Sequence, residues 1–413
     1  MYMHWHLIST IVSMSILSAT WFDEIPRIIR QPDGEILACF ISGDQYLRRL
    51  HDINNFTIVQ HKEDGFFYYA QKDSYGSLIP STIIAGRGNP LSINLQPGYS
   101  LSKEDYNRKK QFYHQEELIR NNRDAPNTGE INQINVFIRF ADDPEFPDDR
   151  STYGEIFETE SDEPSLKHYF SEISHDRLTI NTLHFPGSLD GSNASYVDSH
   201  ERSYYQPYSA ANSNGYQSQS DRFLREHSLV ANALNSISQS VPSSVDLDLD
   251  DNGFVDAVSI VVYGTQGAWA DLLWPHRTAL FNEEVYINGA QVYDYLFMLS
   301  ESWYYNVGVL CHEFGHVLGA PDYYHYSAGS GPTPVGYWDV MGSVRNPPQY
   351  PSAFTKWKYF NWIEPVEITS SGTYSLMPLQ EEENSSFFIS SPFSEEEYFI
   401  FEYRNQEGMY DSN

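Results

Sequence analysis

The sequence of 413 residues has few cysteines, few basic side chains and no long apolar run. Two cysteines, Cys39 and Cys311, exclude a framework of several disulfides and allow one bridge at most. Lys and Arg number 25 against 56 Asp and Glu, so the formal net charge is −31. This balance argues against nucleic acid or an anionic membrane as a partner, because like charges repel. An acidic surface suits a secreted protein, a calcium-rich medium or a salty habitat.

The apolar run at residues 7–19 is too short for a comfortable membrane span, and it lies where a signal peptide belongs. Residues 1–20 are therefore predicted to be a signal peptide, which makes the protein secreted, with no stable membrane association once the signal is removed. The first residues include His4 and His6 but no Lys or Arg, and the small-residue pattern around Ala19 is poor. A buried N-terminal strand or helix is the alternative.

The sequence motif most indicative of function is H-E-x-x-H-x-x-G-x-x-D, which runs from His312 to Asp322. On a helix His312 and His316 lie one turn apart on one face, so both imidazoles can reach one metal ion. Gly319 can end the helix in a left-handed conformation and return Asp322 toward them. Three protein ligands with an open fourth position are typical of a catalytic zinc site, and Glu313 is placed to act as a base. The alternative is a surface helix with two unrelated histidines.

Two further features support this interpretation. Leu310, Phe314, Val317 and Leu318 recur at helical spacing, which predicts a helix anchored in a core. Met341 follows shortly after the motif and matches the Met-turn that passes beneath the metal in metzincins. A methionine that fills a gap in the core is the alternative.

The order of predicted elements indicates an α/β catalytic domain over residues 131–362. Alternating apolar residues predict a strand at 134–140, and Ser165 is expected to cap a helix that starts at Leu166. Further strands are expected at 178–185, 256–263 and 292–299, with a second helix at 219–239 and the helix of the motif last. Residues 264–281 are expected to form a cleft rim, in which His276 either contacts substrate or is structural.

An Asp-rich loop at 246–256 predicts a calcium site. With Asp248 as position 1, the loop has oxygen ligands at the EF-hand positions 1, 3, 5, 7 and 9 and Gly253 at position 6, although position 12 is Ser259. Clustered carboxylates repel unless a cation neutralises them, which favours Ca²⁺ over a solvated turn. The expected ligands are Asp248, Asp250, Asn252, the carbonyl of Phe254 and Asp256.

The flanking regions differ from the catalytic pattern. Residues 21–97 contain short apolar and aromatic runs between turn signals, which predicts a β-rich module that is either a propeptide or a permanent domain. Residues 98–130 are polar and are expected to form a linker open to proteolytic processing. Residues 363–413 are expected to be the start of a β-rich, truncated C-terminal module, with strands at 372–376 and 397–403.

The segments HEFGHVLGAPD, GYWDVMGS and DLDLDDNGFVDAVSIVVYG resemble the immune-inhibitor-A family of secreted bacterial metallopeptidases, which are metzincins. QPDGEILACFISGDQY and EYFIFEYRNQEGMYD extend the resemblance over most of the chain. It implies a metzincin-like α/β (α+β) domain, in which a twisted mixed sheet lies over the zinc helix. It also implies a zinc endopeptidase acting on protein or peptide substrates.

Other functions stay open at this point. One is an extracellular binding or adhesion protein with a non-catalytic zinc site, although a structural site has no use for a base at Glu313. Another is a zinc hydrolase that acts on a non-peptide substrate. Cys311 is expected to be a buried small residue, and a Cys39 thiolate that blocks the zinc in a latent form is a further hypothesis.

Overall fold

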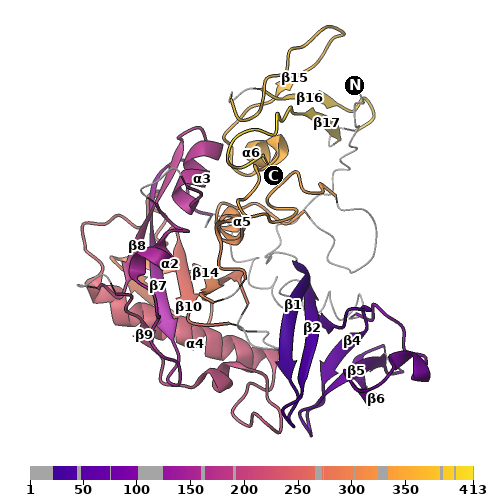
Figure 1. Ribbon diagram of the computed structural model, residues 1–413. Helices are drawn as coiled ribbons and strands as arrows, with labels where there is room; N and C mark the ends of the chain where they lie inside the picture. The colour runs from indigo at the N-terminus through magenta and orange to yellow at the C-terminus, as the bar shows by residue number, and fades with distance from the viewer. Residues whose placement is uncertain are drawn as a thin grey trace.

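The computed structural model describes residues 22–43, 48–74, 76–100, 124–159, 163–188, 192–265, 272, 274–301, 303–323, 334–381, 385–394 and 397–412. Figure 1 shows the chain from the indigo N-terminal sheet to the yellow C-terminal strands. The predicted signal peptide and most of the predicted linker lie outside the described residues.

Six antiparallel strands form one sheet at the N-terminal end, in sequence order. Its buried face holds Ile29, Leu50 and Ile58, each at most 1 % exposed. Tight turns such as Asp33-Gly34 join the strands, with Gly34 at φ +92. The strands are β1 (Phe22–Arg30), β2 (Ile36–Gly43), β3 (Arg48–His51), β4 (Thr57–Gln60), β5 (Phe67–Lys72) and β6 (Leu78–Ile84).

The central sheet has the strand order β11-β14-β10-β7-β8. Strands β7, β8, β10 and β14 are parallel, and β11 pairs antiparallel with β14 at the edge. A short strand, β9 (Tyr196–Val197), also pairs with β7. The bounds are β7 (Gly129–Arg139), β8 (Leu178–Phe185), β10 (Val258–Val262), β11 (His276–Ala279) and β14 (Asp294–Leu299).

Helices cover both faces of this sheet (Figure 1). Alternate residues of β7 separate the two cores: Ile134 and Val136 pack in the cluster that contains Leu229 of α4, and Phe137 belongs to the cluster that contains Phe314 of α5. The helices are α2 (Arg150–Gly154), α3 (Leu166–Ile173), α4 (Gln219–Ile237), α5 (Val307–Val317) and α6 (Ala353–Lys358), with 3₁₀ turns η1 (Pro90–Ile93), η2 (Arg202–Tyr205) and η3 (Ser238–Ser240).

Several predicted elements are present as expected. Ser165 caps α3 by accepting a hydrogen bond from the His168 N–H, and α3 starts at Leu166. Strand β8 has the predicted bounds, and α4, β10 and β14 lie within two residues of the predicted ones. Strand β7 starts at Gly129, so the last residues of the predicted linker belong to the sheet. The fold is therefore a mixed α/β fold with several sheets.

Other elements differ from the prediction. The expected strand at 372–376 is wrong, because these mostly exposed residues form no strand. A hairpin of β12 (Val285–Ile287) and β13 (Ala290–Val292) was not expected. The described C-terminal residues form a sheet of β15 (Val366–Glu367), β16 (Phe387–Ser390) and β17 (Tyr398–Phe401). Every helix among the described residues is too short or too polar to cross a membrane.

Candidate active site

Helix α5 carries the H-E-x-x-H motif through the centre of the molecule. Asn306 caps it by accepting a hydrogen bond from the Val309 N–H at 3.0 Å, and all eleven residues of the helix are buried. The helix stops at Val317, and Gly319 follows with φ +93, a conformation that glycine adopts at little cost. The chain then reverses, and Asp322 comes to lie against the helix.

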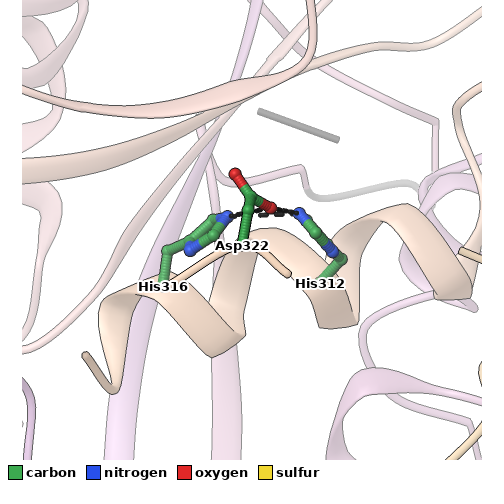
Figure 2. Close-up of side chains that lie close together, drawn as sticks. All are labelled: His312, His316 and Asp322. Carbon is green, nitrogen blue, oxygen red and sulfur yellow. Dashed lines mark hydrogen bonds and ion pairs between the residues drawn. The ribbon is translucent and has the colours of Figure 1, made fainter. Parts of the chain in front are cut away.

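His312, His316 and Asp322 point toward one another, as Figure 2 shows. The two Nε2 atoms are 3.1 Å apart. Oδ1 of Asp322 lies 3.1 Å from Nε2 of His312 and 3.5 Å from Nε2 of His316. The three side chains are at most 9 % exposed.

The hydrogen bonds of the Nδ1 atoms of His312 and His316 determine whether the Nε2 atoms carry a proton or a lone pair. Nδ1 of His312 donates to the carbonyl of Val340 at 2.8 Å, and Nδ1 of His316 donates to the carbonyl of Ala320 at 2.7 Å. In the neutral imidazoles both Nε2 atoms therefore carry lone pairs. Two lone pairs and a carboxylate that face one another at these distances repel, and a bound cation removes the repulsion.

The separations also fit a particular ion. For tetrahedral Zn²⁺ with bonds of about 2.0–2.2 Å, donor atoms lie about 3.3–3.6 Å apart. The separations of 3.1, 3.1 and 3.5 Å come within a few tenths of an ångström of this range. Two nitrogens and one carboxylate oxygen are a donor set that Zn²⁺ accepts.

The charge state of Asp322 is compatible with a ligand role. Burial acts to raise its pKa, but in the metal-free site the charge of protonated His316 and hydrogen bonds from His312 and His316 outweigh burial and hold the pKa of Asp322 below its usual value. The carboxylate is therefore ionised at neutral pH and has a negative charge to offer a cation.

Glu313 follows His312 on α5 and is also fully buried. Successive residues on a helix are rotated by about 100°, so its carboxylate emerges beside the imidazoles instead of in line with them. That position suits a group that exchanges protons with a molecule bound at the three-residue cluster, which is the role predicted from the sequence.

A turn at residues 339–342 passes beneath the helix. A Cβ on Gly315, which lies between the two histidines, would be 2.6 Å from Sδ of Met341. The same turn supplies the Val340 carbonyl that orients His312. The predicted Met-turn residue is thus fully buried against α5, in contact with the helix at Gly315.

Residues 165–346 match the family model described as immune inhibitor A peptidase M6, catalytic domain. This chain is a metallopeptidase. The resemblance predicted from the sequence is thereby confirmed over these residues, and with it the need for a metal ion.

A solved structure also resembles the metallopeptidase, at a low level. Metalloproteinase-II from Bacteroides fragilis, known from a crystal structure, is 10 % identical, over 81 % of this chain and 84 % of that one, with a TM-score of 0.27. No curated protein matches the chain significantly.

The Asp-rich loop of the metallopeptidase forms a second cluster. The carboxylates of Asp248, Asp250 and Asp256 gather within 4.8 Å of one another. Backbone N–H groups of the loop already bind the first of them: Asn252 N donates to Asp248 Oδ1 and Gly253 N donates to Asp248 Oδ2, both at 2.8 Å. Burial, together with the charges of Asp250 and Asp248, raises the pKa of Asp256 to about 7.

His276 lies outside the cluster of His312, His316 and Asp322 in the metallopeptidase. Its Nε2 is 2.8 Å from Oε1 of Glu226, and its Nδ1 is 2.6 Å from the carbonyl oxygen of Trp274. Tyr295 also donates to this carboxylate, at 2.7 Å. The imidazole is thus part of a buried network between α4 and the edge of the central sheet, which assigns it a structural role.

Both cysteines are buried free thiols. Burial raises the pKa of Cys39 to about 12, although Arg27 acts in the opposite direction, and it raises the pKa of Cys311 well above its usual value. A thiolate is the form that binds zinc, so these shifts weigh against the hypothesis of a Cys39 block.

The groups that orient the side chains of His312 and His316 could not be identified from the sequence. The carbonyls of Val340 and Ala320 are backbone groups with no sequence signature. Asp339 directly precedes Val340 in the sequence, and its buried carboxylate accepts a hydrogen bond from the Met341 N–H at 2.8 Å. The available signal was its place in GYWDVMGS, one of the segments that carry the family resemblance.

Proposed function

We propose that the metallopeptidase is a secreted zinc endopeptidase in which His312, His316 and Asp322 hold the ion and Glu313 is the general base. The observation that carries the proposal is that Nε2 of His312, Nε2 of His316 and Oδ1 of Asp322 converge. Each of the two imidazoles also donates its other N–H to a backbone carbonyl. Hydrogen bonds from the outer ring nitrogen fix the tautomer that a metal requires. Secretion is supported by the resemblance and by the apolar run at residues 7–19.

Zinc bound at such a site supplies a Lewis acid that acidifies a water molecule and polarises the scissile carbonyl. Glu313 takes the proton of the attacking water and later delivers it to the leaving amine nitrogen. The buried surroundings of Glu313 strengthen its electrostatic effect on the water, because the local dielectric is low. A base at this position favours catalysis over a purely structural zinc site.

A metzincin-like arrangement is part of the proposal. Its support is the strand order of the central sheet, with four parallel strands and the antiparallel β11 at the edge next to α5, together with the Met341 turn under the helix. Among the described strands β11 has a neighbour on one side alone. A peptide substrate would then bind as an added strand along β11.

Residues 21–97 are proposed to be a propeptide, with 98–130 as the linker to be cut, 131–362 as the catalytic domain and 363–413 as a β-rich C-terminal segment. The catalytic site is shielded from solvent, with Glu313 fully buried. The N-terminal sheet packs on the catalytic part: Arg27 of β1 lies over the ring of Tyr304, and Ile29 and Tyr304 share one core cluster. This contact is three residues before α5, so removal of the sheet would alter the surroundings of the site.

The Asp-rich loop is proposed to bind Ca²⁺ through Asp248, Asp250, Asn252, the Phe254 carbonyl and Asp256. Asp256 is 6 % exposed, and its Oδ1 makes no hydrogen bond to the described residues. A buried carboxylate oxygen without a partner is costly, and a cation in the cluster would satisfy it. The loop is fixed to β13 by hydrogen bonds between Gln291 and the backbone of Gly253 and Val255, so Ca²⁺ would brace the loop against the β12–β13 hairpin.

Chelation and reconstitution test the proposal. The protein, activated by limited proteolysis, is treated with a zinc chelator, dialysed and supplied with Zn²⁺, and the hydrolysis of casein and of a peptide library is followed. Cleavage that disappears with the metal and returns with one equivalent of Zn²⁺ is expected. Zinc binding without cleavage of any protein or peptide would instead favour an adhesion protein or a hydrolase of another substrate.

A further inference from the structure

Asp339 is a fully buried acid in the turn beneath α5. Its Oδ1 accepts a hydrogen bond from the Met341 N–H at 2.8 Å. Its Oδ2 accepts one from the Ser352 N–H at 2.7 Å and one from the Thr355 hydroxyl at 2.6 Å. A buried carboxylate is costly unless its oxygens are bonded in this way, so the carboxylate and the groups around it hold one another in place.

The backbone carbonyl of Asp339 is bonded as thoroughly as its side chain. It accepts from the N–H groups of Gly342 and Ser343 at 2.9 and 3.2 Å, and from the Gln349 side-chain amide at 3.3 Å. Residue 339 therefore connects the turn to the start of α6 (Ala353–Lys358) through its side chain, and to Gln349 through its main chain. The turn cannot shift without breaking these bonds.

Two carbonyls of this turn bind the proposed metal ligands or their neighbours. Val340 accepts from Nδ1 of His312 at 2.8 Å. Met341 accepts at 2.9 Å from the N–H of Tyr323, the residue directly after Asp322. The Tyr323 hydroxyl also lies 3.1 Å from the Thr355 hydroxyl that binds Asp339. One turn thus contacts the ligand set at the helix and again at the returning loop.

We propose that Asp339 is a positioning residue of the metal site: it fixes the turn at 339–341 and thereby sets the orientation of His312 and the position of Asp322. The inference rests on the zinc site proposed above. If the carboxylate is removed, the Val340 carbonyl is no longer fixed, the imidazole can rotate, and the loop that carries Asp322 loses one of its supports. Loss of a group that orients a metal ligand typically changes metal affinity about 10–100-fold.

The test measures the Zn²⁺ affinity of the full chain by competition with a chelator of known affinity, and the visible spectrum of the Co²⁺ form. Asp339→Asn replaces one acceptor oxygen by an N–H₂ group that faces donors. Its zinc Kd is expected to rise by about 10–100-fold, and its Co²⁺ absorption bands are expected to shift. A folded Asp339→Asn protein with the wild-type Kd and the wild-type Co²⁺ spectrum would overturn the inference.

A matched set of variants at Thr355 and Ser352 separates a positioning role of Asp339 from a contribution to general stability. It also tests the inference in the case that Asp339→Asn does not fold. Thr355→Val removes the hydroxyl that binds Asp339 at nearly constant shape, whereas Thr355→Ser retains the hydroxyl. Ser352→Ala removes the side-chain cap of α6 and leaves the Ser352 N–H that binds Asp339. Weaker zinc binding is expected for Thr355→Val and near-wild-type affinity for Thr355→Ser and Ser352→Ala, with the melting temperature of each metal-free protein recorded alongside.

The outcomes distinguish this inference from the proposed function. Equal zinc affinity in Thr355→Val and Thr355→Ser, with a lower melting temperature of the metal-free protein alone, would assign the Asp339 network to stability and overturn the positioning role. A wild-type protein that binds no Zn²⁺ would overturn the metal site itself, and the role of Asp339 with it.

Discussion

Met341 packs its sulfur against Gly315, so closely that a Cβ on the glycine would lie 2.6 Å from Sδ. Glycine inside a helix costs about 1 kcal/mol relative to alanine. Its presence between His312 and His316 is explained by this contact, because no larger residue leaves room for the turn beneath the helix.

Gly315→Ala should therefore destabilise the protein, although alanine has a higher helix propensity than glycine. On a free helix surface the change would stabilise the protein by about 1 kcal/mol. Here Met341 must move, and we expect a net loss of about 1–3 kcal/mol, which is the usual cost of overpacking a core. Thermal unfolding measures the effect, and Met341→Ala in the same chain should relieve part of it. A higher melting temperature for Gly315→Ala would contradict the packing.

Gly308→Ala is expected to be more damaging than Gly315→Ala. A Cβ at Gly308 would overlap the backbone carbonyl oxygen of Arg345, which moves less easily than the end of a methionine side chain. Gly308 lies in the first turn of α5, so the helix would be pushed away from the segment that follows the Met341 turn. The two variants can be ranked by melting temperature, and an equal or smaller loss for Gly308→Ala would refute this explanation.

Parts of the fold could be predicted because their determinants are local. Ser165 caps α3, and Gly319 turns the chain after α5, as their positions in the sequence indicate. Strand β11 could not be predicted in the same way. Its residues His276 and Arg277 are polar, and each is buried beside a carboxylate far along the chain, Glu226 and Asp294 respectively.

The same distinction between local and tertiary determinants applies to the candidate site. The spacing of His312, His316 and Asp322 in the sequence placed them on one helix and its returning loop, where the structure brings them together. For His276 the sequence left open a substrate contact or a structural role, and the structure shows the structural role, because the imidazole binds Glu226. The carbonyls that orient the ligands depend on backbone positions set by tertiary packing, which residue type does not encode.

Asp256 in the Asp-rich loop is expected to make the stability of the protein depend on pH, and Ca²⁺ is expected to weaken this dependence. The pKa of Asp256 is raised to about 7 in the folded chain, against about 3.9 when unfolded. The folded state therefore holds the proton more tightly, so this contribution to stability is complete below about pH 4 and is lost as pH rises through about 7. The melting temperature in EGTA should fall over this range and fall less in Ca²⁺.

Asp256→Asn is the control for that titration. It removes the ionisable group, so the pH dependence in EGTA should become flatter while the response to Ca²⁺ weakens. Asp250→Ala should also lower the gain in melting temperature from Ca²⁺. A melting temperature indifferent to Ca²⁺ in the wild-type protein would refute the calcium site.

The contribution of Glu226 to stability is expected to depend on pH in the opposite direction, with a loss in acid. Burial acts to raise its pKa, but His276 and Arg222 outweigh burial and lower it to about 2. Because the unfolded value is about 4.3, the contribution to stability is complete above that pH and is lost as pH falls toward 2. Glu226→Gln should cost about 3–5 kcal/mol at neutral pH, since it leaves buried partners unpaired, and should flatten the acid limb of the melting curve. An unchanged acid limb would show that Glu226 does not carry it.

The most direct test of the central claim compares wild type with Glu313→Gln after the same activation treatment. Both proteins should contain one equivalent of Zn²⁺, because Glu313 acts as the base and is not a metal ligand. Hydrolysis of casein by the variant should fall by about 10²–10⁴-fold, the usual contribution of a general base. Equal hydrolysis by the two zinc-loaded proteins would contradict the assignment of Glu313.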